Sequence, residues 1–307
     1  MSVMSSVERH AYLIAANANL KVVSTCLQMI DDDKNDVFLL LDKKSHISKE
    51  NIHHLQNVCN RSRVHIMTMV VNWAGYSQVS AVLALLEAAI NTNRNYRYYH
   101  FLQGSDLPIK TQDEIHSFFA ANDGKEFVMI EKKRTDMAIN KTQYRHFFCH
   151  NRFFRTSKIM KALNFGLVYI QRALGIKKKI GMDVYQGSAL FSITDACAKY
   201  VLSKRNEIYK KFRFSLAADE VFLQSILMDS PFGQAIKAVE EDVSENARLI
   251  DRSRPDGKNS PHIWRSSEFS YIINQPANMC FARKFVETVD YEIVEQIYWH
   301  VESRKRI

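Results

Sequence analysis

Asp219 and Glu220 stand directly before a run of apolar and small residues, Val221 to Leu227. Such a run predicts a buried helix that starts near Ala217, with both acids in its first turn and Glu220 on a largely apolar face. A carboxylate on such a face is costly unless it is needed, so this stretch is a candidate for the chemistry of the chain. The structural alternative is that both acids only complement the positive end of the helix dipole.

Fixed positive charge gathers in the loops of the last third of the chain, which contain Arg252, Arg254, Arg265 and Lys284. The whole chain carries a net charge of +9. This excess favours an anionic partner, and nucleic acid, a membrane surface and a phosphorylated substrate all qualify.

The elements that must position these residues alternate along the chain. Short apolar runs predict strands at 11–16, 37–41, 64–71, 98–102, 127–130 and 186–193, and helical spacing predicts helices at 20–30, 78–90, 112–120 and 195–202. Strands that alternate with helices indicate an α/β fold with parallel strands.

Two aspartates follow predicted strands. Asp42 comes at the carboxyl end of the second strand, the edge where open α/β sheets bind ligands, and is a candidate base or ribose contact. Asp106 lies in the loop after the strand 98–102, where it is either a functional group or only a turn cap.

The run Asp31-Asp32-Asp33 resembles the Asp-x-Asp metal motif of many nucleotide-sugar enzymes. A metal motif of that kind should end a strand. These three residues instead fall in the turn between a predicted helix and the next strand, so we interpret them as a solvated turn.

Length and composition indicate one continuous globular domain. The chain has 307 residues, 46% of them hydrophobic, and no linker or repeat interrupts the pattern. Its five cysteines are scattered, which favours neither a disulfide framework nor a zinc site. Because no signal peptide or apolar run of spanning length is present, we expect a soluble, cytoplasmic protein.

The stretch from Lys132 to Lys179 mixes basic and aromatic residues, as nucleic-acid-binding proteins also do. No zinc-finger, winged-helix or ribonucleoprotein pattern accompanies it. We therefore interpret this stretch as a solvated or lipid-facing surface.

Seven segments resemble, in order, the core-2/I-branching β-1,6-N-acetylglucosaminyltransferases, the peptide O-xylosyltransferases and their bacterial relatives. The most specific are Leu102 to Lys110, Gly187 to Phe191 and the motif Phe281-Ala282-Arg283-Lys284-Phe285. The full set is 11–17, 38–45, 72–81, 98–111, 187–193, 218–226 and 276–290.

This resemblance implies a single GT-A type glycosyltransferase domain over 1–307, a Rossmann-like mixed β-sheet flanked by helices, with a variable acceptor-side or membrane-facing insertion at about 132–180. It implies inverting transfer from a UDP-sugar without a metal or other cofactor. Glu220 falls on the family's general base and Lys284 on its diphosphate-binding lysine. Arg265 is the best placement for a partner arginine, with Arg252 and Arg254 as alternatives.

The remaining UDP-sugar contacts are also transferred from the resemblance. They are Asn17, Asp42, Trp73, Asp106, Gly187 and Ser188. The sequence departs from the family at Asn17, where a histidine is usual, in the region 132–179, and in lacking the membrane anchor and disulfides of eukaryotic members.

The expected donor is UDP-N-acetylglucosamine, with UDP-xylose as the alternative, and the expected acceptor is a glycan or a lipid-linked saccharide. A bacterial surface-polysaccharide or lipooligosaccharide pathway fits the missing anchor. The positive charge would hold the enzyme at the anionic inner face of the cell membrane. The competing hypotheses are a nucleic-acid or anionic-surface binding protein and a catalytically silent sugar-binding protein. We expect an enzyme without a nucleic-acid partner.

Overall fold

The computed structural model describes residues 9–254, 256 and 260–305. Its contacts divide the chain into two compact units. The first takes its residues from 1–68, 93–124 and 247–307, and the second consists of 69–92 and 125–246. Each unit is therefore assembled from segments far apart in the sequence. One domain over 1–307 stays a prediction.

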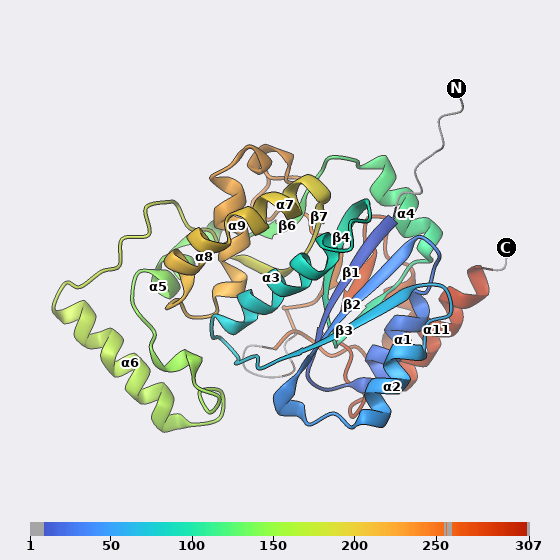
Figure 1. The fold of residues 1–307 in the computed structure, drawn as a ribbon, viewed down its shortest axis with the longest axis horizontal. Helices are drawn as coiled ribbons and strands as arrows, with labels where there is room; N and C mark the ends of the chain where they lie inside the picture. Colours follow the sequence, from blue (N-terminus) through green and yellow to red (C-terminus); the bar gives the residue numbers. More distant parts are fainter. Residues whose placement is uncertain (1–8, 255, 257–259, 306–307) are drawn as a thin grey trace. The chain divides into compact units, whose positions relative to one another are not determined.

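The first unit is built on strands in the order β3-β2-β1-β4 (Figure 1). β1 pairs in parallel with β2 and with β4, so that Leu13 lies between Phe38 and Phe101. Side chains along β1, β2 and β4 are nearly all buried, as expected of parallel strands covered on both faces. The strands are β1 (Arg9–Ala16), β2 (Asn35–Asp42), β3 (Arg63–Met69) and β4 (Tyr96–Gln103).

Helices and a small second sheet complete this unit. Figure 1 shows α1, α2 and α11 grouped beside the strands. In the small sheet β9 pairs antiparallel with β5 and parallel with β8. These elements are α1 (Leu20–Met29), α2 (Lys49–Asn57), α4 (Gln112–Ala121), α10 (Phe269–Ile273), α11 (Glu292–Arg304), β5 (Asp106–Pro108), β8 (Arg248–Ile250) and β9 (Phe281–Arg283).

The second unit combines an antiparallel strand pair with six helices in its described residues. Phe127 of β6 pairs with Ser192 of β7, and Ile130 pairs with Gly187 after an irregularity at Met129. α9 is buried along almost its whole length, from Phe222 to Leu227. The elements are α3 (Ser77–Ile90), β6 (Phe127–Ile130), α5 (Thr135–Thr142), α6 (Lys158–Ala173), β7 (Gly187–Thr194), α7 (Asp195–Ser203), α8 (Arg205–Phe212) and α9 (Phe222–Met228).

The predicted α/β class with mixed strand directions is confirmed, and most element bounds agree to within two residues. Thr194 caps α7, because its side chain accepts a hydrogen bond from the Cys197 N–H. The prediction that Asp31 lies between a helix and the next strand is confirmed. Its carboxylate is not merely solvated, however, because it accepts the N–H groups of Asn60, Arg61 and Ser62. Through these bonds the aspartate fixes the chain that leads into β3.

The helix expected from Ala217 onward is wrong in its first turn. Residues Ala218–Glu220 form a separate 3₁₀ turn, and α9 begins only at Phe222. Ala217 takes a left-handed backbone conformation with φ 47°, and Val221 departs from helical geometry at φ −134°. Glu220 therefore precedes α9 and does not share a face with its leucines.

The basic stretch from Lys132 is not one loop. It contains α5, a 3₁₀ turn at Phe148–His150 and the 16-residue helix α6. Within the described part of the chain, no helix combines the length and the apolar character needed to cross a bilayer.

Candidate functional site

The second unit holds Glu220 in a defined polar contact. Glu220 Oε2 accepts hydrogen bonds from Lys141 Nζ at 2.5 Å and from Gln186 Nε2 at 3.2 Å. Lys141 also donates to Gln186 Oε1 at 3.0 Å, which closes a three-residue network. Among the described residues, none donates a hydrogen bond to the other oxygen, Oε1. The carboxylate is thus anchored through one oxygen while the other can accept a proton.

The 3₁₀ turn sends the two acids to different environments. Asp219 is 7% exposed, whereas the Glu220 side chain is 35% exposed. The turn is fixed by backbone bonds from Ala217 N–H to Ala74 O and from Leu216 N–H to Lys141 O. The conformation of this turn, held by contacts with distant segments, therefore decides which acid faces solvent, and a continuous helix would have placed both differently.

Asp219 is buried, and only one of its two carboxylate oxygens accepts a hydrogen bond from the described residues. Its Oδ2 accepts a hydrogen bond from Gln78 Nε2 at 3.1 Å, while its buried Oδ1 has no partner among the described residues. Burial, and then the charge of Glu220, raise the pKa of Asp219 to about 7, and Lys141 opposes this shift. Near neutral pH a large fraction of Asp219 is therefore uncharged.

The variant Asp219→Asn is expected to reduce the pH dependence of stability. Below about pH 4 the Asp219 carboxyl is protonated in both the folded and the unfolded chain and contributes nothing. As pH rises from about 4 to about 7, only the unfolded chain ionises it, so the wild type loses stability and the loss is complete above the folded pKa. The thermal midpoint of Asp219→Asn minus that of wild type should therefore grow with pH across this window.

The exposed Asp183 supplies the matched control. Asp183→Asn removes the same charge from an exposed position of the second unit, so its midpoint difference shows the effect of losing a surface charge alone. A flat difference for Asp219→Asn would show that Asp219 ionises normally in the folded protein.

Gly187 and Ser188 lie at the start of β7 and are held by backbone contacts. A Cβ atom on Gly187 would come within 1.8 Å of the Met129 carbonyl oxygen, so this position accepts only glycine. The Ser188 carbonyl accepts a hydrogen bond from Gln224 Nε2 at 2.7 Å. Both residues are buried, and these contacts give them structural reasons to be present.

Trp73, in the same unit, is more accessible to solvent than Gly187 and Ser188. Its indole is 43% exposed and stacks on Phe154, with ring centroids 6.4 Å apart. An exposed aromatic face supported from behind is suited to stacking on a planar or sugar ring.

In the first unit, the carboxyl ends of β1 and β2 bring Asn17 and Asp42 to one edge of the sheet. The register pairs Ala16 with Leu41, so the next residue of each strand lies at the same level. Asn17 is exposed and Asp42 is buried. Asp42 accepts the Lys44 N–H at 3.1 Å and pairs with its ammonium at 3.5 Å. The sequence prediction of a strand-end aspartate is confirmed.

Both carboxylate oxygens of Asp106 are bound by residues of the first unit. Its Oδ2 accepts the Gln103 N–H at 2.8 Å, and its Oδ1 pairs with Arg283 Nη1 at 2.6 Å. The side chain is almost completely buried. These contacts match the turn-cap interpretation, and they join the loop after β4 to β9.

Lys284 follows β9 in a well-fixed segment. The Trp264 side chain donates to the Arg283 carbonyl at 2.8 Å, the Trp264 N–H donates to the Lys284 carbonyl at 3.0 Å, and the Phe285 N–H donates to Ser105 O at 2.9 Å. Lys284 Nζ donates to Ser260 Oγ at 3.2 Å. The backbone that carries this ammonium group is therefore held on both sides.

The candidate arginines differ in their contacts. Arg265 pairs with Asp256 at 2.8 Å, and Arg254 pairs with Asp251 at 2.8 Å and with Glu268 at 3.0 Å. Arg252 is exposed. To bind a diphosphate, Arg265 or Arg254 would have to exchange a carboxylate partner for it.

Sequence reasoning missed Lys141, Gln186 and Gln78. Lys141 lies in the stretch that we interpreted as surface, yet its side chain is only 14% exposed. It is 79 positions from Glu220 in the sequence. No local spacing connects such residues, so only the fold could have revealed them.

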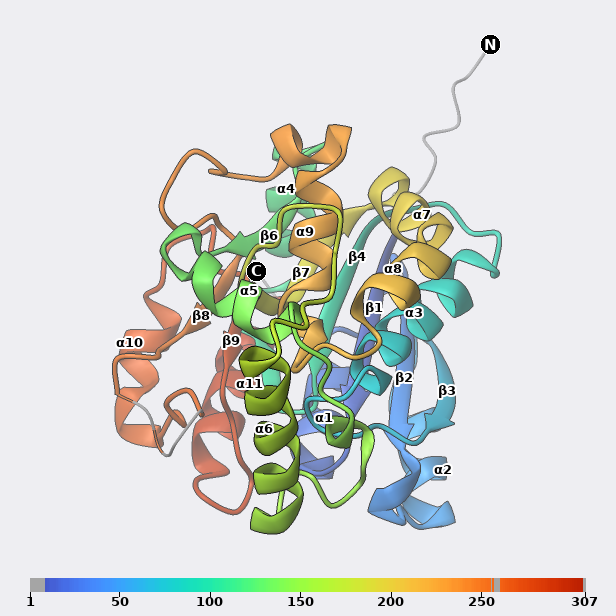
Figure 2. The same cartoon turned by 90° about the vertical axis from the view of Figure 1, so that its left-hand side faces the viewer.

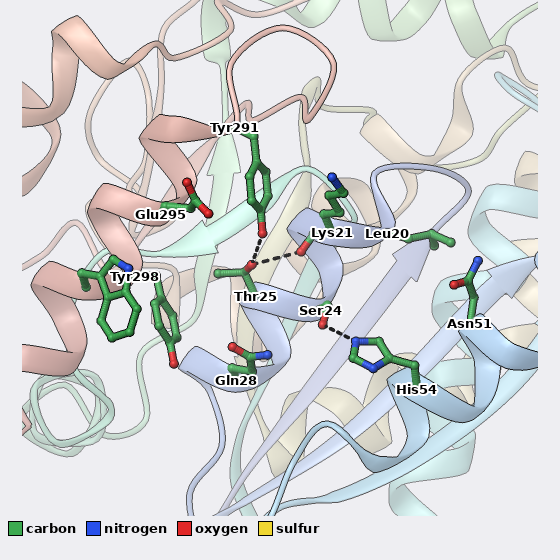
Figure 3. Close-up of a pocket in the computed structure, with 11 residues that line it drawn as sticks. Leu20, Lys21, Ser24, Thr25, Gln28, Asn51, His54, Tyr291, Glu295 and Tyr298 are labelled. Carbon is green, nitrogen blue, oxygen red and sulfur yellow. Dashed lines mark hydrogen bonds between the residues drawn. The ribbon is translucent and has the colours of Figure 1, made fainter.

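A groove in the first unit contains none of the predicted site residues in its lining. It encloses about 410 Å³ between α1, α2 and α11, and Figure 3 shows polar groups from all three helices around it. Tyr291 Oη lies 2.9 Å from Thr25 Oγ1, and Ser24 Oγ lies 2.9 Å from His54 Nε2. These bonds connect α1 to the start of α11 and to α2.

The family can now be assigned from the chain as a whole. Residues 10–272 match the family model described as Core-2/I-Branching enzyme. The chain belongs to this family. The matched range includes Glu220, Asp42 and Arg265 and ends before Lys284, whose assignment rests on the Phe-Ala-x-Lys-Phe motif alone.

Relatives of this core-2/I-branching chain include several xylosyltransferases. It is 22% identical to xylosyltransferase 2 of Rattus norvegicus over 314 residues, covering 95% of this chain and 34% of that protein. It is 20% identical to xylosyltransferase oxt of Drosophila melanogaster, covering 94% and 33%. The chain thus spans about a third of the length of the curated relatives it matches.

Two solved glycosyltransferase structures show a weaker likeness to this core-2/I-branching chain. Core-mannan synthase A of Aspergillus fumigatus is 9% identical with a TM-score of 0.40, covering 77% of this chain and 74% of that one. Mouse xyloside xylosyltransferase 1 is 12% identical with a TM-score of 0.37, covering 92% and 99%.

Proposed function

We propose that this protein is an inverting, metal-independent glycosyltransferase of the GT-A type, which transfers a sugar from a UDP-sugar to a hydroxyl of a glycan acceptor. The family match supports the transferase class. The observation that carries the mechanism is the geometry of Glu220, whose Oε2 is anchored by Lys141 and Gln186 while Oε1 remains open.

Glu220 acts as the general base in this proposal. The acceptor hydroxyl oxygen forms a bond to the anomeric carbon, its proton passes to Glu220 Oε1, and the bond from the anomeric carbon to the diphosphate oxygen breaks with its electron pair. Because Lys141 and Gln186 hold the second oxygen, the carboxylate does not have to be oriented during the reaction. A positioned base contributes about 10²- to 10⁴-fold to the rate.

Lys284 and an arginine stabilise the negative charge that develops on the leaving UDP. A fixed cation on a rigid segment is suited to this task, since it needs little reorganisation during reaction. The contacts of Trp264 and Phe285 supply that rigidity for Lys284. Arg265 is the first choice for the partner arginine, with Arg252 and Arg254 as alternatives, and Asn17, Asp42 and Trp73 are the proposed contacts to the nucleoside and sugar.

The proposed donor is UDP-N-acetylglucosamine, and UDP-xylose is the second candidate because the relatives in the comparison are named xylosyltransferases. The proposed acceptor is a glycan or a lipid-linked saccharide. We further propose that the protein works in the cytoplasm at the inner face of the cell membrane.

Donor hydrolysis and transfer should proceed in EDTA. The purified protein is incubated with each UDP-sugar in EDTA and, separately, with manganese, and release of UDP is measured. We expect one UDP-sugar to be turned over at rates within about twofold in the two buffers, because protein cations perform the task that a divalent ion performs elsewhere. Turnover that occurs only with manganese would refute the metal-free mechanism, and turnover of none of the donors would refute the transferase proposal.

A further inference from the structure

Helix α6 turns its apolar stripe away from the protein. Ile159 and Leu174 are 71% and 67% exposed, and Leu163, Leu167 and Ile170 are between 36% and 51% exposed. Their spacing places these five side chains on one side of the helix and its last turn. A surface helix normally buries such a stripe against its own domain, so the orientation of α6 is inverted.

Another side of α6, which includes the buried Asn164, attaches the helix through polar contacts. Asn164 accepts the Phe148 N–H at 3.3 Å and lies 2.9 Å from His146 Nδ1. Gln171 accepts the Arg145 N–H at 2.9 Å and donates to the Arg145 carbonyl at 3.0 Å. These bonds fix the rotation of the helix, so the exposed stripe is held outward by specific contacts.

The charge around α6 has a single sign. Between Met137 and Met182 the sequence contains ten Lys or Arg residues and no Asp or Glu. Exposed members of this set lie just before the helix, at Arg152 and Arg155, and just after it, at Lys177 and Lys179. Figures 1 and 2 both show α6 at the edge of the second unit, away from its helices α7 and α9.

We propose that α6 and the basic segments at its two ends dock on an anionic lipid bilayer. An outward aliphatic stripe flanked by basic residues is the pattern of helices that lie in the membrane interface. At 16 residues α6 is about 24 Å long, too short to span the hydrocarbon core and suited to lying in its surface. The aliphatic side chains enter the acyl region while the basic side chains reach the phosphate groups.

A second copy of the chain is a poorer occupant of this surface. Two copies that meet through α6 would bring their basic, acid-free segments together and would repel one another. Anionic phospholipid instead supplies the opposite charge along the whole surface. The proposal extends the membrane location given under the proposed function, and it is independent of the transferase chemistry because it concerns binding of the protein to lipid.

Vesicle flotation tests the proposal directly. The full chain is mixed with phosphatidylcholine vesicles or with vesicles that also contain phosphatidylglycerol, and the bound fraction is measured at low and high salt. We expect binding at least about tenfold tighter to the anionic vesicles, and we expect it to weaken as salt rises.

Two sets of substitutions separate the apolar and charged contributions. The triple variant I159S/L163S/I170S should weaken binding by about tenfold or more, since each buried aliphatic carbon contributes to insertion. The triple variant K158Q/K177Q/K179Q should weaken binding to anionic vesicles by on the order of 100-fold at low salt. All six side chains are exposed, so circular dichroism spectra and thermal midpoints should match those of wild type.

A matched control uses exposed valines elsewhere. V70S/V243S/V289S removes three aliphatic side chains of similar exposure outside α6 and should bind like wild type. The proposal is overturned if wild type does not float with anionic vesicles, or if the α6 variants and the control lose the same amount. It is also overturned if light scattering shows a wild-type dimer that I159S/L163S/I170S dissociates while vesicle binding is absent.

Discussion

Glu220→Gln is expected to reduce kcat for sugar transfer by about 10²- to 10⁴-fold, because the amide cannot take the proton of the acceptor hydroxyl. The glutamine has nearly the same shape and can still accept a hydrogen bond from Lys141 or Gln186. Loss of the partly exposed ion pair with Lys141 should cost at most about 1 kcal/mol of stability. Steady-state kinetics, UDP affinity by calorimetry and thermal midpoint together check this expectation.

Glu207 provides the matched control for this substitution. Its side chain is 34% exposed, close to that of Glu220, and it pairs with Lys204 and Lys211 in the same unit. Glu207→Gln should leave kcat within about twofold of wild type, as expected for a surface ion pair. Equal turnover of Glu220→Gln and Glu207→Gln would remove Glu220 from the mechanism.

Lys284→Met is expected to lower kcat by about 10²- to 10³-fold, the usual effect of losing one preorganised group that stabilises charge in the transition state. Its thermal midpoint should change little, because the backbone bonds that hold the segment do not involve the Lys284 side chain. Single-turnover kinetics with a saturating donor would separate this chemical step from weaker binding.

Lys284→Arg distinguishes charge from geometry at this position. Arginine keeps the positive charge, so part of the lost rate should return, whereas full recovery is not expected because the shape of its donor group differs. The exposed Lys49 on α2 serves as the control, and Lys49→Met should leave transfer unchanged. If Lys284→Met kept wild-type kcat, the leaving group would have to be stabilised elsewhere.

Much of the fold is visible in the sequence. β1, β2 and β4 are apolar runs whose residues are buried on both faces, so composition and length predict them without tertiary information. Because β1 and β2 are parallel and neighbouring, they end at the same side of the sheet and place Asn17 and Asp42 at one edge. The motif residues Glu220 and Lys284 could likewise be proposed from the sequence through the family resemblance.

The surroundings of the candidate base were decided by tertiary structure alone. The break at Val221 depends on Ala217 being held by Ala74, a contact between residues over a hundred positions apart, and local helix spacing cannot anticipate it. That break buries Asp219 and turns Glu220 toward Lys141 and Gln186.

The same distinction applies to α6. Its amphipathic spacing can be found in the sequence, but the spacing does not say which side meets the protein. Polar bonds from Asn164 and Gln171 to the preceding segment decide the rotation and leave the aliphatic side outward. The sequence by itself determined the strands, the helices and the chemical types at the site. Contacts between distant segments decided which side chains meet, because only the folded backbone brings such residues within bonding distance.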